Sequence, residues 1–236
     1  MSDRAQEIAD NLTVVRERLA SACAEAGRRV NEVTLTVVTK FFPVSDIAIL
    51  ADLGIRDVGE NRHQEAATKA AETHDLDLRW HFIGNLQSNK AAAVAAYADV
   101  VESVDRVKLI KGLAQGASER ETTIDCLVQV NLEAQESSGA PGRGGAAPSD
   151  VVALSQGLAT AAGLRLRGVM AVAPLGEDPV PAFERLGALA ERVRRVDPAA
   201  TWISAGMSED LEAAIGAGAT HVRIGSAVLG RRPTIK

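Results

Sequence analysis

The sequence predicts a (β/α)8 barrel with one extra helix at its N-terminal end. The length of 236 residues suits a single barrel domain that spans residues 1–236. Strand-like and helix-like segments alternate along the chain, which is the order that a parallel barrel requires. Polar residues gather after the predicted strands, at the end of a barrel where active sites form. A doubly wound parallel sheet would produce a similar order of elements and is the alternative.

The elements follow one another in a regular order. A helical pattern covers residues 4–26, with apolar positions at helical spacing and Gly27 at its end. The segments with short apolar, β-branched runs predict strands at 33–39, 55–58, 80–83, 99–103, 124–130, 165–172, 201–204 and 221–224. Helical patterns lie between and after them at 45–53, 61–73, 87–97, 105–118, 149–162, 179–196 and 208–217, with a short last helix after Gly225.

Composition limits the classes of protein to consider. Hydrophobic residues supply 46% of the chain and aromatic residues only 3%, so we expect a core of Ala, Val, Leu and Ile. The net charge of −5 argues against nucleic-acid or anionic-membrane partners. No apolar run has the length of a membrane span, and the start lacks a secretory segment, so we expect a cytoplasmic monomer. Cys23 and Cys126 have no metal-ligand spacing, and we expect no metal.

One segment differs from the rest of the chain. Residues 133–149 are rich in Gly, Ser, Ala and Pro and predict a flexible loop. Because the loop follows the fifth predicted strand, it would hang over the end of the barrel where sites form. We expect a mobile flap there, and disorder without a function is the alternative.

Lys40 is the first candidate functional residue. In the predicted strand, a period of two puts Val33, Leu35 and Val37 on one face and Thr36, Val38 and Lys40 on the other. A lysine at the carboxyl end of an inward-facing row lies in the barrel mouth. Burial of an amine lowers its pKa, and the neutral amine attacks carbonyl groups. A surface lysine at a strand end is the alternative.

Two later segments have the composition of phosphate-binding turns. They are Ser204-Ala205-Gly206-Met207-Ser208 and Arg223-Ile224-Gly225-Ser226. Glycine lets backbone N–H groups approach an anion, serine adds a hydroxyl, and the following helix offers its positive end. Glu209 and Asp210 would repel a phosphate, so we expect Gly225-Ser226 to be the main cradle. Arg223 shares a strand face with His221 and needs an inward partner, which could be a phosphate, a ring nitrogen or an internal carboxylate.

An amine and a phosphate cradle at one barrel mouth suit a ligand that carries an aldehyde and a phosphate. Pyridoxal phosphate and sugar phosphates have both groups. Asn61 and His81 follow or belong to the second and third predicted strands, and so stand at the same end of the barrel. Each also has a structural interpretation, Asn61 as a helix cap and His81 as a core histidine.

The chain resembles the pyridoxal phosphate homeostasis proteins over nearly its whole length. The motifs that carry the resemblance are Val38-Thr39-Lys40 before Pro43, Gly59-Glu60-Asn61 with Gln64-Glu65, the run from Trp80 to Lys90, Ser103-Val104-Asp105, Gly168-Val169-Met170-Ala171, Gly206-Met207-Ser208 with Asp210, and Val222-Arg223-Ile224-Gly225. The resemblance implies a barrel like the N-terminal domain of alanine racemases. It also implies that Lys40 forms a Schiff base with pyridoxal 5′-phosphate. The residues implied to hold the phosphate and ring are Ser204, Gly206, Met207, Ser208, Arg223, Gly225 and Ser226, with Asn61 and His81 nearby.

The resemblance further implies a protein that buffers or delivers the cofactor, without turnover of its own. Apo forms of pyridoxal-phosphate enzymes are then the expected partners. The sequence departs from the family where a loop lysine is usual, because it has Arg143-Gly144-Gly145 instead, and at Ala205, where a polar or large residue is usual. Arginine keeps the charge but does not readily accept an aldehyde.

An amino-acid racemase is the alternative function. Racemization needs acid/base groups on both faces of the substrate, and related racemases take a tyrosine from a second domain. The chain ends at Lys236, soon after the last predicted strand, so we expect no such domain. Its one tyrosine, Tyr97, stands in a helical pattern away from the predicted mouth. A sugar-phosphate aldolase that uses Lys40 suits the barrel but not the ordered motifs.

Overall fold

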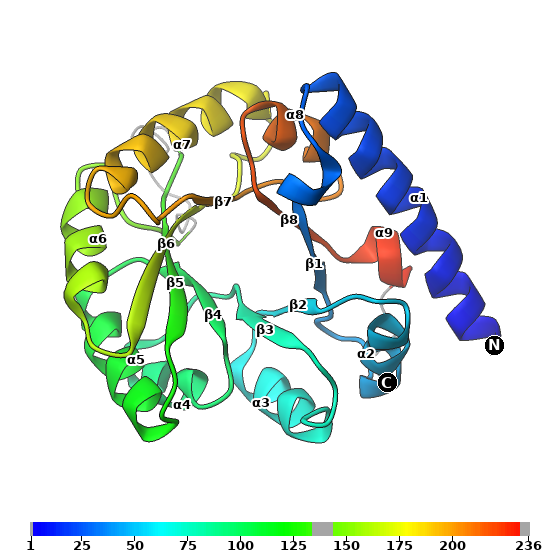
Figure 1. Cartoon of the computed structure of the whole chain (residues 1–236), viewed down its shortest axis with the longest axis horizontal. Coiled ribbons are helices and arrows are strands. Elements are labelled where there is room, and N and C mark those ends of the chain that lie inside the picture. Colours follow the sequence, from blue (N-terminus) through cyan, green and yellow to red (C-terminus); the bar gives the residue numbers. More distant parts are fainter. Residues whose placement is uncertain (1, 134–143, 232–236) are drawn as a thin grey trace.

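The computed structural model describes residues 2–133 and 144–231, which form a closed parallel barrel ringed by helices (Figure 1). The strands are joined in chain order, and the first pairs with the last, so the predicted (β/α)8 fold is confirmed. Their bounds are β1 Thr34–Val38, β2 Asp57–Glu60, β3 Arg79–Phe82, β4 Val100–Val104, β5 Ile124–Gln129, β6 Leu164–Met170, β7 Trp202–Ser204 and β8 His221–Ile224.

The helices follow the predicted order with small changes at their ends. Their bounds are α1 Asp3–Glu25, α2 Val44–Asp52, α3 His63–Glu72, α4 Ala91–Ala95, α5 Val107–Glu119, α6 Val151–Thr160, α7 Pro179–Arg194, α8 Leu211–Gly216 and α9 Ser226–Leu229, with 3-10 turns η1 Val30–Glu32 and η2 Ser88–Lys90. The predicted helix at 87–97 divides into η2 and α4. The predicted helix at 208–217 begins only at Leu211, because Asp210 Oδ1 accepts the N–H of Met207 at 2.6 Å within a preceding turn.

The barrel wall separates an aliphatic outer layer from a more polar interior. Between strands and helices, the largest fully buried side chains are Phe183 and a set of Ile and Leu residues, so the core is aliphatic as expected. Inside the barrel, the small apolar cluster of Val100, Leu127 and Met170 packs against Trp202. The buried polar residues that the strands carry are Thr36, Glu60, His81, Glu102, Ser103, Asp125, Ser204, His221 and Arg223.

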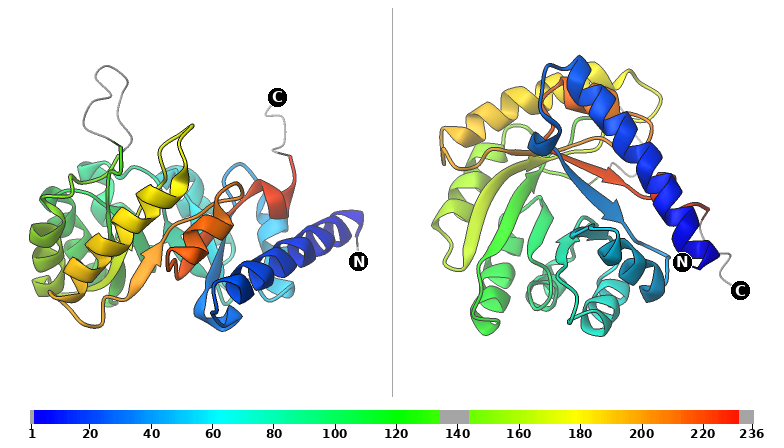
Figure 2. Two further views of the ribbon diagram at one scale, coloured as in Figure 1. Left: turned by 90° about the horizontal axis from the view of Figure 1, so that it is seen from above. Right: turned by 45° about the vertical axis from the view of Figure 1, so that its right-hand side comes forward.

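The extra helix α1 packs against α2, α8 and α9 on the outside of the barrel (Figures 1 and 2). Arg4 on α1 donates to Asp46 of α2 at 2.5 Å and to the carbonyl oxygen of Leu229 at 2.9 Å. Asn11 donates to the carbonyl oxygen of Val228 at 3.1 Å. Since Val228 and Leu229 belong to α9, these bonds secure the segment that follows β8.

The segment predicted as a flexible loop at 133–149 is only partly described. Residues 134–143, with Arg143, lie outside the described residues. The prediction of an unpacked loop is wrong for the end of the segment, where Ala146 is buried and pairs with β5. Its N–H donates to Gln129 O at 2.8 Å, and its carbonyl accepts from Asn131 N at 2.9 Å. Backbone hydrogen bonds hold this stretch, which a composition-based prediction does not detect.

Among the helices of the described ranges 2–133 and 144–231, none is both long enough and apolar enough to cross a bilayer.

Gly168 on β6 tests the close packing of the barrel wall. Its φ is +148°, and a Cβ at this position would overlap the carbonyl oxygen of Trp202 on β7. We expect Gly168→Ala to lower the free energy of unfolding by about 3 kcal/mol or more, measured by urea denaturation. Gly187→Ala, inside α7 with only an ordinary contact to a backbone oxygen, is the control and should raise it by about 0.5–1 kcal/mol. Equal stabilities of the two variants would contradict the overlap.

Candidate functional site

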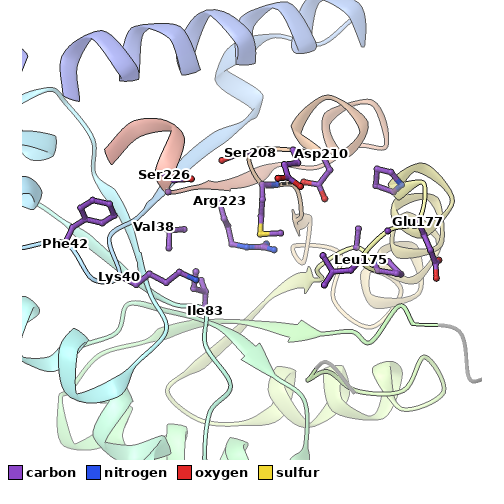
Figure 3. Close-up of a pocket in the computed structure, with 17 residues that line it drawn as sticks. Val38, Lys40, Phe42, Ile83, Leu175, Glu177, Ser208, Asp210, Arg223 and Ser226 are labelled. Atoms are coloured by element: carbon purple, nitrogen blue, oxygen red, sulfur yellow. Dashed lines mark hydrogen bonds between the residues drawn. The ribbon is translucent and has the colours of Figure 1, made fainter. Parts of the chain in front are cut away.

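A cavity of about 600 Å³ opens at the carboxyl ends of the strands (Figure 3). Its walls come from segments after β1, β3, β6, β7 and β8. Among the predicted site residues, those that line it are Lys40, Met207, Ser208, Arg223, Gly225 and Ser226. The predicted residues Asn61, His81, Ser204 and Gly206 are not part of the lining.

Lys40 follows β1 and extends into the cavity toward Ile83 (Figure 3). The predicted alternation is confirmed, because Val38 and Lys40 line the cavity while Val37 packs in the outer core. The Lys40 side chain is half-buried. A lysine in this place has its amine at the barrel mouth, as the strand pattern predicted, and not on the outer surface.

The opposite wall holds the residues predicted to bind a phosphate. Gly225 and Ser226 come at the start of α9, and Ser208 lies in the turn after β7. A Cβ at position 225 would lie 3.2 Å from the carbonyl oxygen of Val38, so the close approach of β8 and β1 favours glycine there. The first turn of a helix leaves backbone N–H groups without intrahelical partners. The wall therefore offers amide and hydroxyl donors to an anion.

Arg223 connects the cavity to the barrel interior. Only 4% of the residue is exposed, and yet it forms part of the cavity lining. Its Nη1 donates to Ser204 Oγ at 2.6 Å and its Nη2 to Ala171 O at 2.8 Å, while Nη1 lies 3.8 Å from Glu102 Oε2. Of the partners that the sequence left open, the internal carboxylate is present. Burial lowers the pKa of Arg223, and the charge of Glu102 opposes that shift.

A chain of buried hydrogen bonds continues from Arg223 through the barrel. Ser204 Oγ donates to Glu102 Oε2 at 2.6 Å, Glu102 Oε1 lies 2.7 Å from His81 Nδ1, and His81 Nε2 lies 2.9 Å from Asp57 Oδ1. Ser204 and His81 are members of this hydrogen-bond network and lie outside the cavity lining, and their predicted contact with a ligand stays a prediction. Ser204 contacts Arg223 directly, and His81 contacts Glu102, which lies beside Arg223.

The side chains of this buried network stabilise one another's charged forms. Burial alone would raise the pKa of Glu102, but the hydrogen bond and charge of His81, with Arg223 and Ser204, lower it to about 2. Burial alone would lower the pKa of His81, but hydrogen bonds to Asp57 and Glu102 raise it. The favoured state is thus an ionised Glu102 between two cations, His81 and Arg223.

Asn61 and Gly206 shape the backbone near the cavity. The Asn61 backbone packs so closely on Gly84 that a Cβ at position 84 would overlap its carbonyl oxygen. Gly206 has a φ of +92°, and its carbonyl accepts the N–H of Arg223 at 2.9 Å. Both residues therefore fix turns, while their predicted contact with a ligand stays a prediction.

Sequence reasoning missed two contributions to this region. Glu102 stands in the buried strand Val100–Val104, whose other residues are three valines and Ser103, and a buried acid there requires a partner, which was an available signal. The segment after β6 also lines the cavity through Ala173, Pro174, Leu175, Gly176 and Glu177. Leu175 is 83% exposed, and nothing in its local pattern indicated a place at the mouth.

Comparisons with known proteins agree with this fold. Residues 6–233 match the family model described as "Alanine racemase, N-terminal domain". The chain is 40% identical to the pyridoxal phosphate homeostasis protein of Mycobacterium tuberculosis H37Rv, covering 98% of this chain and 95% of the relative. It is 36% identical to that of Escherichia coli K12, covering 96% and 97%.

A solved structure is similar over the same extent. PipY of Synechococcus elongatus PCC7942, described with PLP bound, superposes with a TM-score of 0.80 at 33% identity, covering 94% of this chain and 100% of that one. The fold is that of the barrel domain found in alanine racemases. The chain belongs to that family and, within it, to the pyridoxal phosphate homeostasis proteins.

The pH dependence of stability tests the buried network of hydrogen bonds that runs from Arg223 to Asp57. Because the folded pKa of His81 is raised above 6.5, its stabilisation is full below that pH and is lost as the pH rises through the raised value. His81→Gln should therefore destabilise most near about pH 6, by about 3 kcal/mol, and less toward about pH 9. Glu102 gives the opposite pH dependence, because the stabilisation from its ionised carboxylate is present above pH 4.5 and is lost as the pH falls toward its folded pKa of about 2.

Urea denaturation across this pH range gives the free energies. His74→Gln is the control, because His74 is exposed, follows the C-terminal end of α3 and takes no part in the buried network, so the change should alter the free energy of unfolding by less than about 0.5 kcal/mol. A loss in His81→Gln that is constant with pH would mean that the His81 charge has no role.

Proposed function

We propose that this protein binds pyridoxal 5′-phosphate as a Schiff base on Lys40 and serves intracellular cofactor homeostasis by buffering or delivering it. The observation that carries the proposal is that Lys40 and a wall that contains Ser208, Gly225 and Ser226 line the same cavity (Figure 3). The relative PipY, which is described with PLP bound and shares 33% of its residues with this chain, supports the choice of cofactor.

The residues present fit the chemistry of that cofactor. Lys40 would hold the aldehyde, because a lysine amine and an aldehyde condense with the release of one water. Ser226, Gly225 and Ser208 would offer backbone and hydroxyl donors to the phosphate. Arg223, a cation beside Glu102, would supply a fixed positive charge at the cavity. When bound, the cofactor supplies an aldehyde that reacts with amines.

The site favours a carrier over a racemase. A racemase needs a second acid/base group opposite the lysine. Tyr97 is the one tyrosine of the chain, and its ring stacks on His63 with centroids 5.9 Å apart, outside the cavity lining. If Arg223 faced the ring nitrogen, that nitrogen would stay unprotonated and the ring would be a poorer electron sink. We therefore propose a non-catalytic role, with apo forms of pyridoxal-phosphate enzymes as recipients.

Covalent trapping tests the assignment of Lys40. We expect borohydride reduction of the loaded protein, followed by peptide mass mapping, to put the pyridoxyl group on Lys40. Lys40→Ala should abolish the adduct and the corresponding absorption band. Lys90→Ala, a change at the end of η2, is the control and should leave both unchanged. An adduct mainly on another lysine would refute the assignment.

Substitution at the cradle tests the phosphate site. Ser226→Asp places an anion against the phosphate and should weaken binding of pyridoxal 5′-phosphate at least about tenfold, or about 1.4 kcal/mol. Ser118→Asp adds the same charge on the exposed side of α5 and should leave the affinity unchanged. Equilibrium dialysis gives both affinities. If the two variants bind equally well, the phosphate lies elsewhere.

A further inference from the structure

A second lysine, Lys69 on α3, lies buried behind the turn that carries Lys40. Only 6% of the residue is exposed. Its Nζ donates to Glu60 Oε1 at 2.7 Å, to Glu65 Oε1 at 2.6 Å and to the carbonyl oxygen of Thr39 at 2.9 Å. These partners come from β2, from α3 and from the residue that precedes Lys40. Lys69 is not part of the cavity lining.

The same cluster holds the chain on both sides of Lys40. On one side, Thr39 is bonded twice, through its carbonyl to Lys69 and through its Oγ1, which donates to Glu60 Oε1 at 2.7 Å. On the other side, the N–H of Phe41 donates to Glu65 Oε1 at 2.6 Å. The two residues that flank Lys40 are therefore tied to one buried group of charges.

The turn needs such support because its backbone is strained. Phe41 has a φ of +72°, in the left-handed region that side chains other than glycine rarely adopt. A residue held there costs about 1–3 kcal/mol, and it persists when its surroundings fix it. The bond from the Phe41 N–H to Glu65 and the bond of 3.0 Å from the Phe42 N–H to the carbonyl oxygen of Thr39 both hold the turn in this conformation.

Electrostatics make Lys69 the central member of the cluster. Two carboxylates, Glu60 and Glu65, share its ammonium group. Burial raises the pKa of Glu60, while the hydrogen bond and charge of Lys69 oppose that rise. Without Lys69, two acids would face each other beside the carbonyl of Thr39, and the clamp on the turn would open.

We propose that Lys69 is a positioning residue, which fixes residues 39–41 so that the Lys40 amine reaches the aldehyde of a bound ligand. The inference rests on the proposed function in one respect, that Lys40 is the amine which reacts. It adds that a buried ion cluster centred on Lys69, which lies outside the cavity lining, controls that reaction. Binding of phosphate and ring is then separable from capture of the aldehyde.

Two ligands that differ only in the aldehyde separate these steps. Pyridoxal 5′-phosphate reports capture at Lys40, followed by absorption and by borohydride trapping with mass mapping. 4-Deoxypyridoxine 5′-phosphate has no aldehyde and reports binding alone. In Lys69→Met, we expect capture at Lys40 to be at least about tenfold slower, with affinity for the aldehyde-free ligand within about twofold of wild type. Lys111→Met, at an exposed site on α5, is the control and should change neither value.

A second pair of variants avoids dependence on a fully buried position. Glu65 is 23% exposed at its side chain, so Glu65→Ala removes the acceptor of the Phe41 N–H with less disturbance of the core. We expect the same selective slowing of capture in Glu65→Ala. Glu65→Gln retains an acceptor oxygen and should restore capture to within about threefold of wild type.

The outcomes distinguish this inference from the proposed function. Unchanged capture in Lys69→Met and Glu65→Ala would overturn the positioning role. An equal loss of capture and of aldehyde-free binding would also overturn it, because the cluster would then support only the fold of the site. Absence of a Lys40 adduct in the wild-type protein would instead refute the proposed function, and this inference would be refuted with it.

Discussion

The ion pair between Arg223 and Glu102 inside the barrel is the interaction on which the rest of the site depends. A guanidinium that is 96% removed from solvent is costly unless carboxylate and carbonyl acceptors surround it. Those acceptors come from β4, from β7 and from the residue that follows β6, so they assemble only when the barrel closes. The same closure leaves Arg223 at the floor of the cavity. The bonds that stabilise the arginine are therefore also the bonds that put a fixed positive charge next to the ligand.

The barrel interior differs from the aliphatic layer around it for the same reason. Glu102 is held ionised by His81 on one side and by Arg223 on the other, and the Ser204 hydroxyl forms hydrogen bonds with both the acid and the arginine. Such a connected set tolerates few changes, because the removal of one member leaves another charge buried without its partner. The apolar side chains inside the barrel, Val100, Leu127 and Met170, fill the space that this set leaves.

The two lysines near β1 show how surroundings decide the role of a side chain. Lys69 is committed to two carboxylates and a backbone carbonyl, and it stands behind the barrel wall. Lys40 extends from the adjoining turn into the cavity, opposite the wall formed by Ser208, Gly225 and Ser226 (Figure 3). The Lys69 ammonium, fixed by two acids, orders the backbone, whereas the Lys40 amine is accessible to a ligand in the cavity. We infer that the order imposed by Lys69 positions Lys40.

The sequence by itself determined the class of fold, the order of its elements and the location of the candidate site at the strand ends. These features depend on short-range patterns: β-branched runs predict strands, a period of two places Val38 and Lys40 inward, and Gly225-Ser226 before a helix predicts an anion cradle. Glu102, an acid within the buried strand Val100–Val104, was a further signal in the sequence, because a buried acid requires a partner. Composition was misleading for Ala146, whose conformation is decided by backbone bonds to Gln129 at the end of β5 and to Asn131.

Only the tertiary structure decided which polar groups meet. Ser204 and Glu102 are 102 positions apart, and Lys69 reaches Thr39 across 30. No local pattern specifies such pairs, because the free energy of a buried charge depends on every strand that contributes a partner. His81 illustrates the difference, since its strand face was predictable but its acidic neighbours, Asp57 and Glu102, were not. Local periodicity fixes the direction of a side chain, and closure of the barrel fixes its partner.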